Sequence, residues 1–244
     1  MDDGTVKAGE ARTVEAGRGA TWWTDGWTLF TKNAGLWIVL GLILFLIFIV
    51  LGFIPFIGWL ASSLLAPLFV GSWMLASRKV ESGGALEVGD LFSAFKGEQM
   101  TQLLVVGALL LAGTIVIGLV VGMFGFGAAA GMMAGGHAGS AGGMMAAAGA
   151  SMLAFLVMMA LGLLVAMAIW FAPALVVFRG AQPVDAMKAS FSACLKNIVP
   201  MLVYGVIYLV AALVASIPFG LGWIVLVPVV LLTMYVSYKD VFVI

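Results

Sequence analysis

The placement of the charged residues constrains the fold of this chain more than any other feature. Lys and Arg residues precede the first long apolar stretch, lie between the second and third and between the fourth and fifth, and follow the sixth. The gaps between the first and second, third and fourth, and fifth and sixth stretches contain none, and the acidic residues follow the same pattern. Because positively charged loops stay on the cytoplasmic side of a membrane, this alternation predicts six spans with both termini in the cytoplasm.

The composition supports an integral membrane protein. Hydrophobic residues make up 64% of the chain and charged residues 9%, whereas soluble domains are about a quarter charged. The formal net charge is zero, so nucleic acid is not expected as a partner. Residues 1–20 are polar and of mixed charge, with no apolar core that would indicate a signal peptide. They are predicted to form a disordered cytoplasmic tail ahead of a transmembrane domain over 21–244.

Six apolar stretches have the length of about 20 residues that a helix needs to cross about 30 Å of hydrocarbon. An all-α fold is expected, because a helix satisfies its backbone polar groups within the segment. A low-complexity Gly/Ala/Met segment over 126–150 is predicted to be the outer loop between the third and fourth spans. The predicted spans are 34–54, 56–76, 103–124, 151–178, 198–217 and 221–237.

The spans are predicted to form three antiparallel hairpins related by a pseudo-threefold repeat. The first and third hairpins share a Lys-Asn pair before the first span, and their tips read IPFIGW at 54–59 and IPFGLGW at 217–223. Each returning span contains a proline and ends near a basic residue. The middle hairpin fits the pattern more loosely.

A short amphipathic stretch precedes each hairpin and is predicted to lie as a helix in the headgroup plane. The apolar residues recur at helical spacing. Trp22, Trp23 and Trp27 in the first stretch are predicted interface anchors; a docking surface for a protein partner is the alternative. The recurring apolar residues are Trp23, Trp27 and Phe30 in the first stretch; Val88, Leu91, Phe92 and Phe95 in the second; and Met187, Phe191, Cys194 and Leu195 in the third.

Proline and glycine residues within the spans indicate kinks and close packing. Pro67, Pro173 and Pro228 each lie in a returning span, where each frees the carbonyl four residues earlier. We expect them to kink their helices, although the freed carbonyls are also candidates to line a central site. Gly118 and Gly122 form a small-x-x-x-small pair that is typical of helix contacts in membranes.

The segment over 126–150 contains the single histidine of the chain, with methionines on either side. Thioether and imidazole groups are soft ligands that suit Cu(I), so copper is the one cofactor to consider. The alternative is an uncharged or partly helical tip in which Met is an apolar filler. The candidate ligands are Met132, Met133, His137, Met144 and Met145.

Several motifs resemble those of an uncharacterised family of proteobacterial six-helix inner-membrane proteins. The resemblance covers nearly all of the chain from about residue 19, and it implies a bacterial inner-membrane location without any activity or substrate. The 126–150 segment departs from the family in its length and Met content. The motifs are GWTLF at 26–30, IPFIGW at 54–59, LAPL at 65–68, WFAPAL at 170–175, AMKAS at 186–190 and YG at 204–205.

No catalytic constellation is visible in the sequence. The single His and the single Cys lie on opposite sides of the predicted membrane, and no acidic or basic residue lies within a predicted span. A non-enzymatic protein that organises lipid or a partner complex is therefore the first hypothesis, with membrane lipids as expected partners. The alternative is a permease or channel for a neutral or apolar solute, with Ser62, Ser63, Thr114, Tyr204, Tyr208 and Thr233 as candidate lining.

Overall fold

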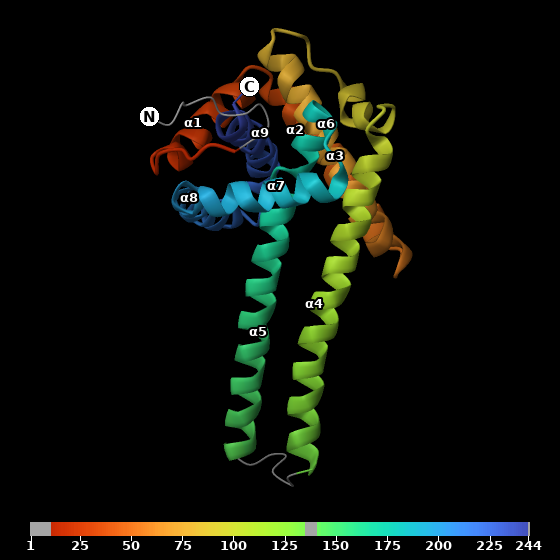
Figure 1. The fold of residues 1–244 in the computed structure, drawn as a ribbon, viewed down its shortest axis with the longest axis vertical. Coiled ribbons are helices and arrows are strands. Elements are labelled where there is room, and N and C mark those ends of the chain that lie inside the picture. Colours follow the sequence, from red (N-terminus) through yellow and green to blue (C-terminus); the bar gives the residue numbers. More distant parts are fainter. Residues whose placement is uncertain (1–10, 135–140, 244) are drawn as a thin grey trace, which may run out of the picture.

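The structure describes residues 11–134 and 141–243, and most of these residues are helical. In this computed structural model they form nine α-helices and one 3-10 helix joined by short connections, and no strand occurs among them (Figure 1). Six helical segments are long and apolar enough to cross a membrane. The prediction of an all-helical protein with six candidate spans is confirmed. The helices are α1 (Arg18–Thr31), α2 (Ala34–Gly52), α3 (Ile57–Glu81), η1 (Val88–Phe95), α4 (Met100–Ala134), α5 (Ala141–Trp170), α6 (Ala172–Arg179), α7 (Pro183–Lys196), α8 (Ile198–Ser216) and α9 (Trp223–Phe242).

The segment expected as an outer loop over 126–150 is largely helical. Helix α4 continues to Ala134 and α5 already begins at Ala141, because the segment is rich in Ala, the strongest helix former. At about 1.5 Å per residue the two helices are about 50 and 45 Å long. Figure 1 shows them as a long green hairpin that extends well beyond the other helices.

The fourth span is interrupted, contrary to the prediction of one continuous helix over 151–178. Helix α5 ends at Trp170, and α6 begins at Ala172 with Pro173 in its first turn. Proline lacks a backbone N–H and is favoured where that donor is not needed, so it starts a helix here. Pro67 and Pro228 do lie inside the helices α3 and α9, as expected.

The spans pack in a row rather than only within hairpins. Helix α9 packs on α2 and α3, α3 packs on α4, and α4 packs on α5. Consecutive spans also contact one another, but α3 packs more extensively on α4 than on α2. The threefold hairpin repeat therefore stays a prediction. The largest fully buried side chains are Trp22, Trp37, Trp73, Tyr235 and Tyr238.

All three predicted amphipathic stretches are helical, and they lie against the spans. Helix α1 packs on α8 and α9, η1 packs on α3, and α7 packs on α5 and α6. Figure 1 shows α7 crossing the end of α5. Each of the three helices is therefore packed against at least one candidate span.

Candidate functional site

The last turns of α9 hold a buried carboxylate, Asp240, that ties the two ends of the chain together. Its side chain is 7% exposed and accepts hydrogen bonds from Arg12 Nη2 at 2.6 Å and from Arg18 Nε at 2.6 Å. The indole Nε1 of Trp22 donates a third at 2.8 Å. A buried carboxylate requires such compensation, because an unpaired charge is strongly disfavoured away from water.

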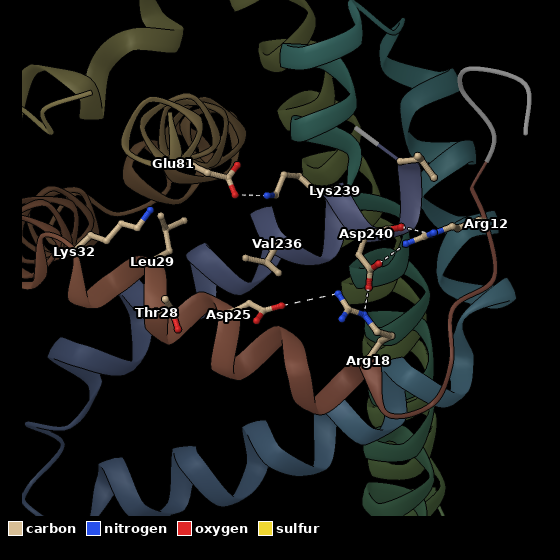
Figure 2. A pocket seen from close by; sticks show the side chains of 11 residues that line it. Arg12, Arg18, Asp25, Thr28, Leu29, Lys32, Glu81, Val236, Lys239 and Asp240 are labelled. Carbon is tan, nitrogen blue, oxygen red and sulfur yellow. Dashed lines mark hydrogen bonds and ion pairs between the residues drawn. The ribbon is translucent and has the colours of Figure 1, made fainter. Parts of the chain in front are cut away.

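A second ion pair lies beside the first. Lys239 pairs with Glu81 at the end of α3, and the hydroxyl of Tyr235 donates to the other Glu81 oxygen at 2.7 Å. Figure 2 shows Lys32 approaching Glu81 from the opposite side. The two ion-pair groups border a cavity of about 420 Å³ between α1, α3 and α9. Its charged lining is Arg12, Arg18, Asp25, Lys32, Glu81, Lys239 and Asp240.

We call the region around this cavity, with the ion pairs of Asp240 and Glu81, the charged end of the molecule. The segment before α1 belongs to it. The predicted disordered tail covered residues 1–20, but Arg12 N donates to the carbonyl of Val241 at 2.9 Å. The N–H of Val14 donates to Asn197 Oδ1 at 2.8 Å, and Asn197 Nδ2 donates to the Arg12 carbonyl at 2.9 Å. Asn197 is fully buried between α7 and α8. Residues 11–20 are therefore part of the packed structure.

A serine on α7 repairs the break in the fourth span. The N–H of Phe171 donates to Ser190 Oγ at 2.9 Å, and that hydroxyl donates to the Met167 carbonyl at 2.7 Å. The thiol of Cys194, one turn further along α7, donates to the same carbonyl at 3.6 Å. Backbone groups exposed by the break are thus satisfied by α7, which fixes this helix against the end of α5.

A crevice of about 430 Å³ lies between α5, α7 and α8. Its lining is mainly apolar, and α7 bridges the two spans because it contacts both. A side chain built at Gly205 would meet no atom within 4 Å, so this part of the wall faces open space. The lining residues are Leu163, Ala166, Met167, Trp170, Cys194, Ile198, Met201, Leu202, Tyr204, Gly205, Tyr208 and Val230.

The only cysteine of the chain borders this crevice as a neutral group. Burial raises the pKa of the Cys194 thiol from its ordinary value of 9.0 to about 12. A thiol acts as a nucleophile or metal ligand in its ionised form. Cys194 therefore contributes packing and a weak hydrogen bond at neutral pH.

The three predicted interface tryptophans have different surroundings. Trp22 is fully buried and bonded to Asp240, so it lies in the protein interior and not at the lipid interface. Trp23 stacks on Tyr204 with the ring centroids 5.0 Å apart. Trp27 is half exposed and is the one of the three available to headgroups or a partner.

Two of the predicted prolines mark close helix contacts, whereas the predicted glycine pair does not. An added Cβ at Gly41 would lie 2.9 Å from Pro228 Cγ, and one at Gly107 would lie 2.6 Å from the Leu64 carbonyl oxygen, one turn before Pro67. At Gly118 and Gly122 a Cβ would meet no atom within 4 Å. Gly41 and Gly107 therefore lie at tight contacts between spans, whereas Gly118 and Gly122 do not.

The candidate copper ligands are only partly described. His137 lies outside the described residues, as do the side chains of Met132, Met133 and Met144. Met145 is on α5, and its side chain is 77% exposed. Copper binding by these residues stays a prediction.

The sequence does not predict a role for Asp240, Ser190 or Gly205. Asp240 carries a weak signal, because it is an acidic residue soon after an apolar span. Ser190 and Gly205 lie in the AMKAS and YG motifs, but those motifs indicate a resemblance and not a contact. Their roles come from neighbours that are distant in the sequence.

Comparisons with known proteins agree with a membrane location. The chain is 28% identical over 212 residues to a probable inner membrane protein of Burkholderia thailandensis, and the match spans 86% of this chain and 78% of that protein. No family model matches, and no solved structure matches. Together with the six apolar helices, this similarity identifies the chain as a multi-pass membrane protein that resembles a bacterial inner-membrane protein.

Proposed function

We propose that the protein is a non-enzymatic inner-membrane protein that holds a lipid acyl chain in the crevice between α5, α7 and α8. The observation that carries this proposal is the crevice itself, an apolar space between two membrane spans. Its volume of about 430 Å³ falls in the range of roughly 300–1,000 Å³ of small-molecule sites. Both termini are proposed to be cytoplasmic, on the positive-inside pattern.

An acyl chain is the occupant that fits the location. Within a bilayer the molecules surrounding an apolar crevice are lipids, and an apolar cavity is not a favourable site for water. Trp170 and Tyr204 stand in the wall with their ring centroids 5.4 Å apart. Amphipathic aromatic side chains are enriched where the acyl region meets the headgroups, so the crevice has an apolar body and an aromatic margin.

The polar residues of the charged end support a structural role. Asp240 accepts hydrogen bonds from three side chains, and Glu81 accepts from Tyr235 and Lys239. These carboxylates join helices that are distant in the sequence. A carboxylate bonded in this way holds together the helices that carry its donors, which supports a structural role.

Transport ranks below lipid binding, because four of the six candidate lining residues have hydroxyls that are bonded within the protein. Ser63 donates to the Trp59 carbonyl and Thr114 to the Leu111 carbonyl of the same helix. Tyr204 and Thr233 bond to each other at 2.8 Å in the protein interior. These bonds direct the hydroxyls to neighbouring protein groups rather than to a shared polar path.

The test is to fill the crevice and measure the lipid that co-purifies with the protein. Gly205→Leu places a side chain in the open space of the crevice, and Gly118→Leu is the matched control on an exposed face of α4. We expect mass spectrometry of protein purified in mild detergent to show most of the tightly bound lipid lost from Gly205→Leu and retained in Gly118→Leu. Equal lipid content in the two variants, or no bound lipid in the unaltered protein, would contradict the proposal.

A further inference from the structure

Three basic residues from three different spans meet in one cleft. Arg78 is near the end of α3, Arg179 ends α6, and Lys239 is in the last turn of α9. They line a cleft of about 220 Å³ together with Phe178 and Tyr235. In the sequence these residues only mark the ends of the second, fourth and sixth spans. The fold brings the three cations to one place.

The positive charge of this cleft is only partly compensated. Lys239 pairs with Glu81, which is not part of the cleft lining. Among the described residues, Arg78 and Arg179 form no ion pair, and no carboxylate lines the cleft. Arg179 donates to the carbonyl oxygen of Phe242. The guanidinium groups of Arg78 and Arg179 therefore leave two formal positive charges beside the cleft.

The aromatic side chains hold the cations in place. The Arg78 guanidinium lies over the Phe178 ring, 4.6 Å from its centroid, and Lys239 Nζ lies 5.3 Å from the centroid of Tyr235. A stacked guanidinium keeps its N–H edge free for a second partner. Arginine is well suited to phosphate, because its planar fork donates two parallel hydrogen bonds to two phosphate oxygens.

We propose that this cleft binds a phosphate group, supplied in the membrane by the headgroup of an anionic phospholipid. The three cations stand at the ends of apolar spans, which is the depth of the lipid phosphates. Basic pockets between membrane helices on the cytoplasmic side are suited to anionic headgroups. The neighbouring cavity of Figure 2 is a weaker candidate, because Asp240 already engages Arg12 and Arg18 there. The proposal does not depend on the acyl-chain crevice, since the two sites share no lining residue.

The test compares two sources of phosphate. One arm titrates inorganic phosphate against the protein in a neutral detergent; the other measures phosphatidylglycerol retained by native mass spectrometry from phosphatidylcholine nanodiscs. We expect the double variant Arg78→Gln/Arg179→Gln to bind each phosphate probe about tenfold or more weakly, because both charge-assisted contacts are removed. Lys96→Gln removes an exposed basic residue outside the cleft and should leave binding unchanged.

The outcomes separate the source of the ligand from the existence of the site. If the double variant loses phosphatidylglycerol and the unaltered protein does not bind inorganic phosphate, the cleft is a headgroup site. If the double variant loses the binding of both probes, the cleft also accepts free phosphate. Arg78→Gln alone is a second variant that should fold, because its side chain is exposed; we expect it to weaken binding measurably. The proposal is overturned if the unaltered protein binds neither probe, or if Lys96→Gln weakens binding as much as the cleft variants. Gly205→Leu should not affect this site.

Discussion

The charged end of the molecule and the α4–α5 hairpin are built in opposite ways. At the charged end, α9 is packed on several sides, and 61% of its apolar window is buried inside the protein. In the candidate spans of α4 and of α5 with α6, the buried shares are 11% and 6%. Both regions are helical, so secondary structure does not distinguish them. The difference lies in contacts between residues that are far apart in the sequence.

This contrast indicates where stability resides. Arg12 and Asp240 are 228 residues apart in the chain, and Tyr235 and Glu81 are 154 apart. These bonds join the segment before α1, the end of α3 and the last turns of α9 at the charged end. The far half of the hairpin depends on helix propensity and on the contact between α4 and α5. Substitutions at the two ends should therefore have very different effects on stability.

The largest effect is expected at Asp240. Asp240→Ala removes the carboxylate that Arg12, Arg18 and Trp22 share. Removing one partner of a buried ion pair costs about 3–5 kcal/mol, because the remaining charges lose their compensation. The loss of unfolding free energy should be near the lower limit of this range, since both arginines are partly exposed. Chemical denaturation in mixed micelles measures the free energy of unfolding.

Asp25→Asn is the control for this prediction. Asp25 is half exposed, and its carboxylate lies 3.9 Å from Arg18 Nη2. An exposed pair of this kind contributes about 0–1 kcal/mol. Equal destabilisation by Asp240→Ala and Asp25→Asn would show that the buried carboxylate does not hold the charged end together.

A smaller effect is expected where α7 closes the break in the fourth span. Ser190→Ala leaves the Phe171 N–H without its partner and removes one donor from the Met167 carbonyl. An unsatisfied buried group costs about 1–3 kcal/mol. Ser192→Ala, on the exposed face of the same helix, should change the free energy of unfolding by less than about 0.5 kcal/mol. An unchanged free energy of unfolding in Ser190→Ala would mean that α7 is not fixed by this bond.

The pH dependence of stability should show the burial of Cys194. The pKa of the Cys194 thiol is about 12 in the folded state and about 9.0 in the unfolded state. Between these values the unfolded chain loses a proton that the folded chain keeps, which favours unfolding. Stability is therefore unaffected below pH 9 and falls as the pH rises towards 12. Relative to Cys194→Ala, the loss should reach about 1.4 kcal/mol by pH 10. A constant difference between the two proteins from pH 7 to 10 would contradict a buried thiol.

The smallest effect is expected beyond the candidate spans of the long hairpin. Met145 is 77% exposed on α5, ahead of the span that begins at Ala148. Met145→Ser should change the free energy of unfolding by no more than about 0.5 kcal/mol, as is usual for an exposed site. A loss comparable to that of Ser190→Ala would show that this part of the hairpin is packed against another surface.

The sequence predicts the spans well because hydropathy is a local property. The first predicted span, 34–54, differs from α2 (Ala34–Gly52) by two residues at one end. Pro173 shows the limit, since a proline in an apolar span is compatible with a kink or a break. The position of Ser190 on another helix completes the break, and that contact is invisible in the sequence. The 126–150 segment is predicted as a loop, with a partly helical tip as the alternative, and it is helical up to Ala134 and from Ala141. Its Gly content obscures the helix propensity of its alanines.

The candidate sites depend on contacts that no local pattern specifies. The charge pattern predicts that Arg78, Arg179 and Lys239 lie on the same side of the membrane, but only the packing of α3, α6 and α9 brings them into one cleft. The crevice likewise depends on the separation of α5 from α8, which α7 bridges. The burial of Trp22 is not predictable from the sequence for the same reason, because its partner Asp240 is 218 residues away.

The central claim is that the crevice between α5, α7 and α8 holds a lipid acyl chain. Its most direct test is crosslinking in native membranes with a phospholipid that carries a photoactivatable group midway along one acyl chain. We expect crosslinked peptides to concentrate at 163–170 and 198–208 and to be lost from those segments in Gly205→Leu. Crosslinks spread evenly over exposed apolar positions such as Phe45 and Leu213, with no change in Gly205→Leu, would contradict the account.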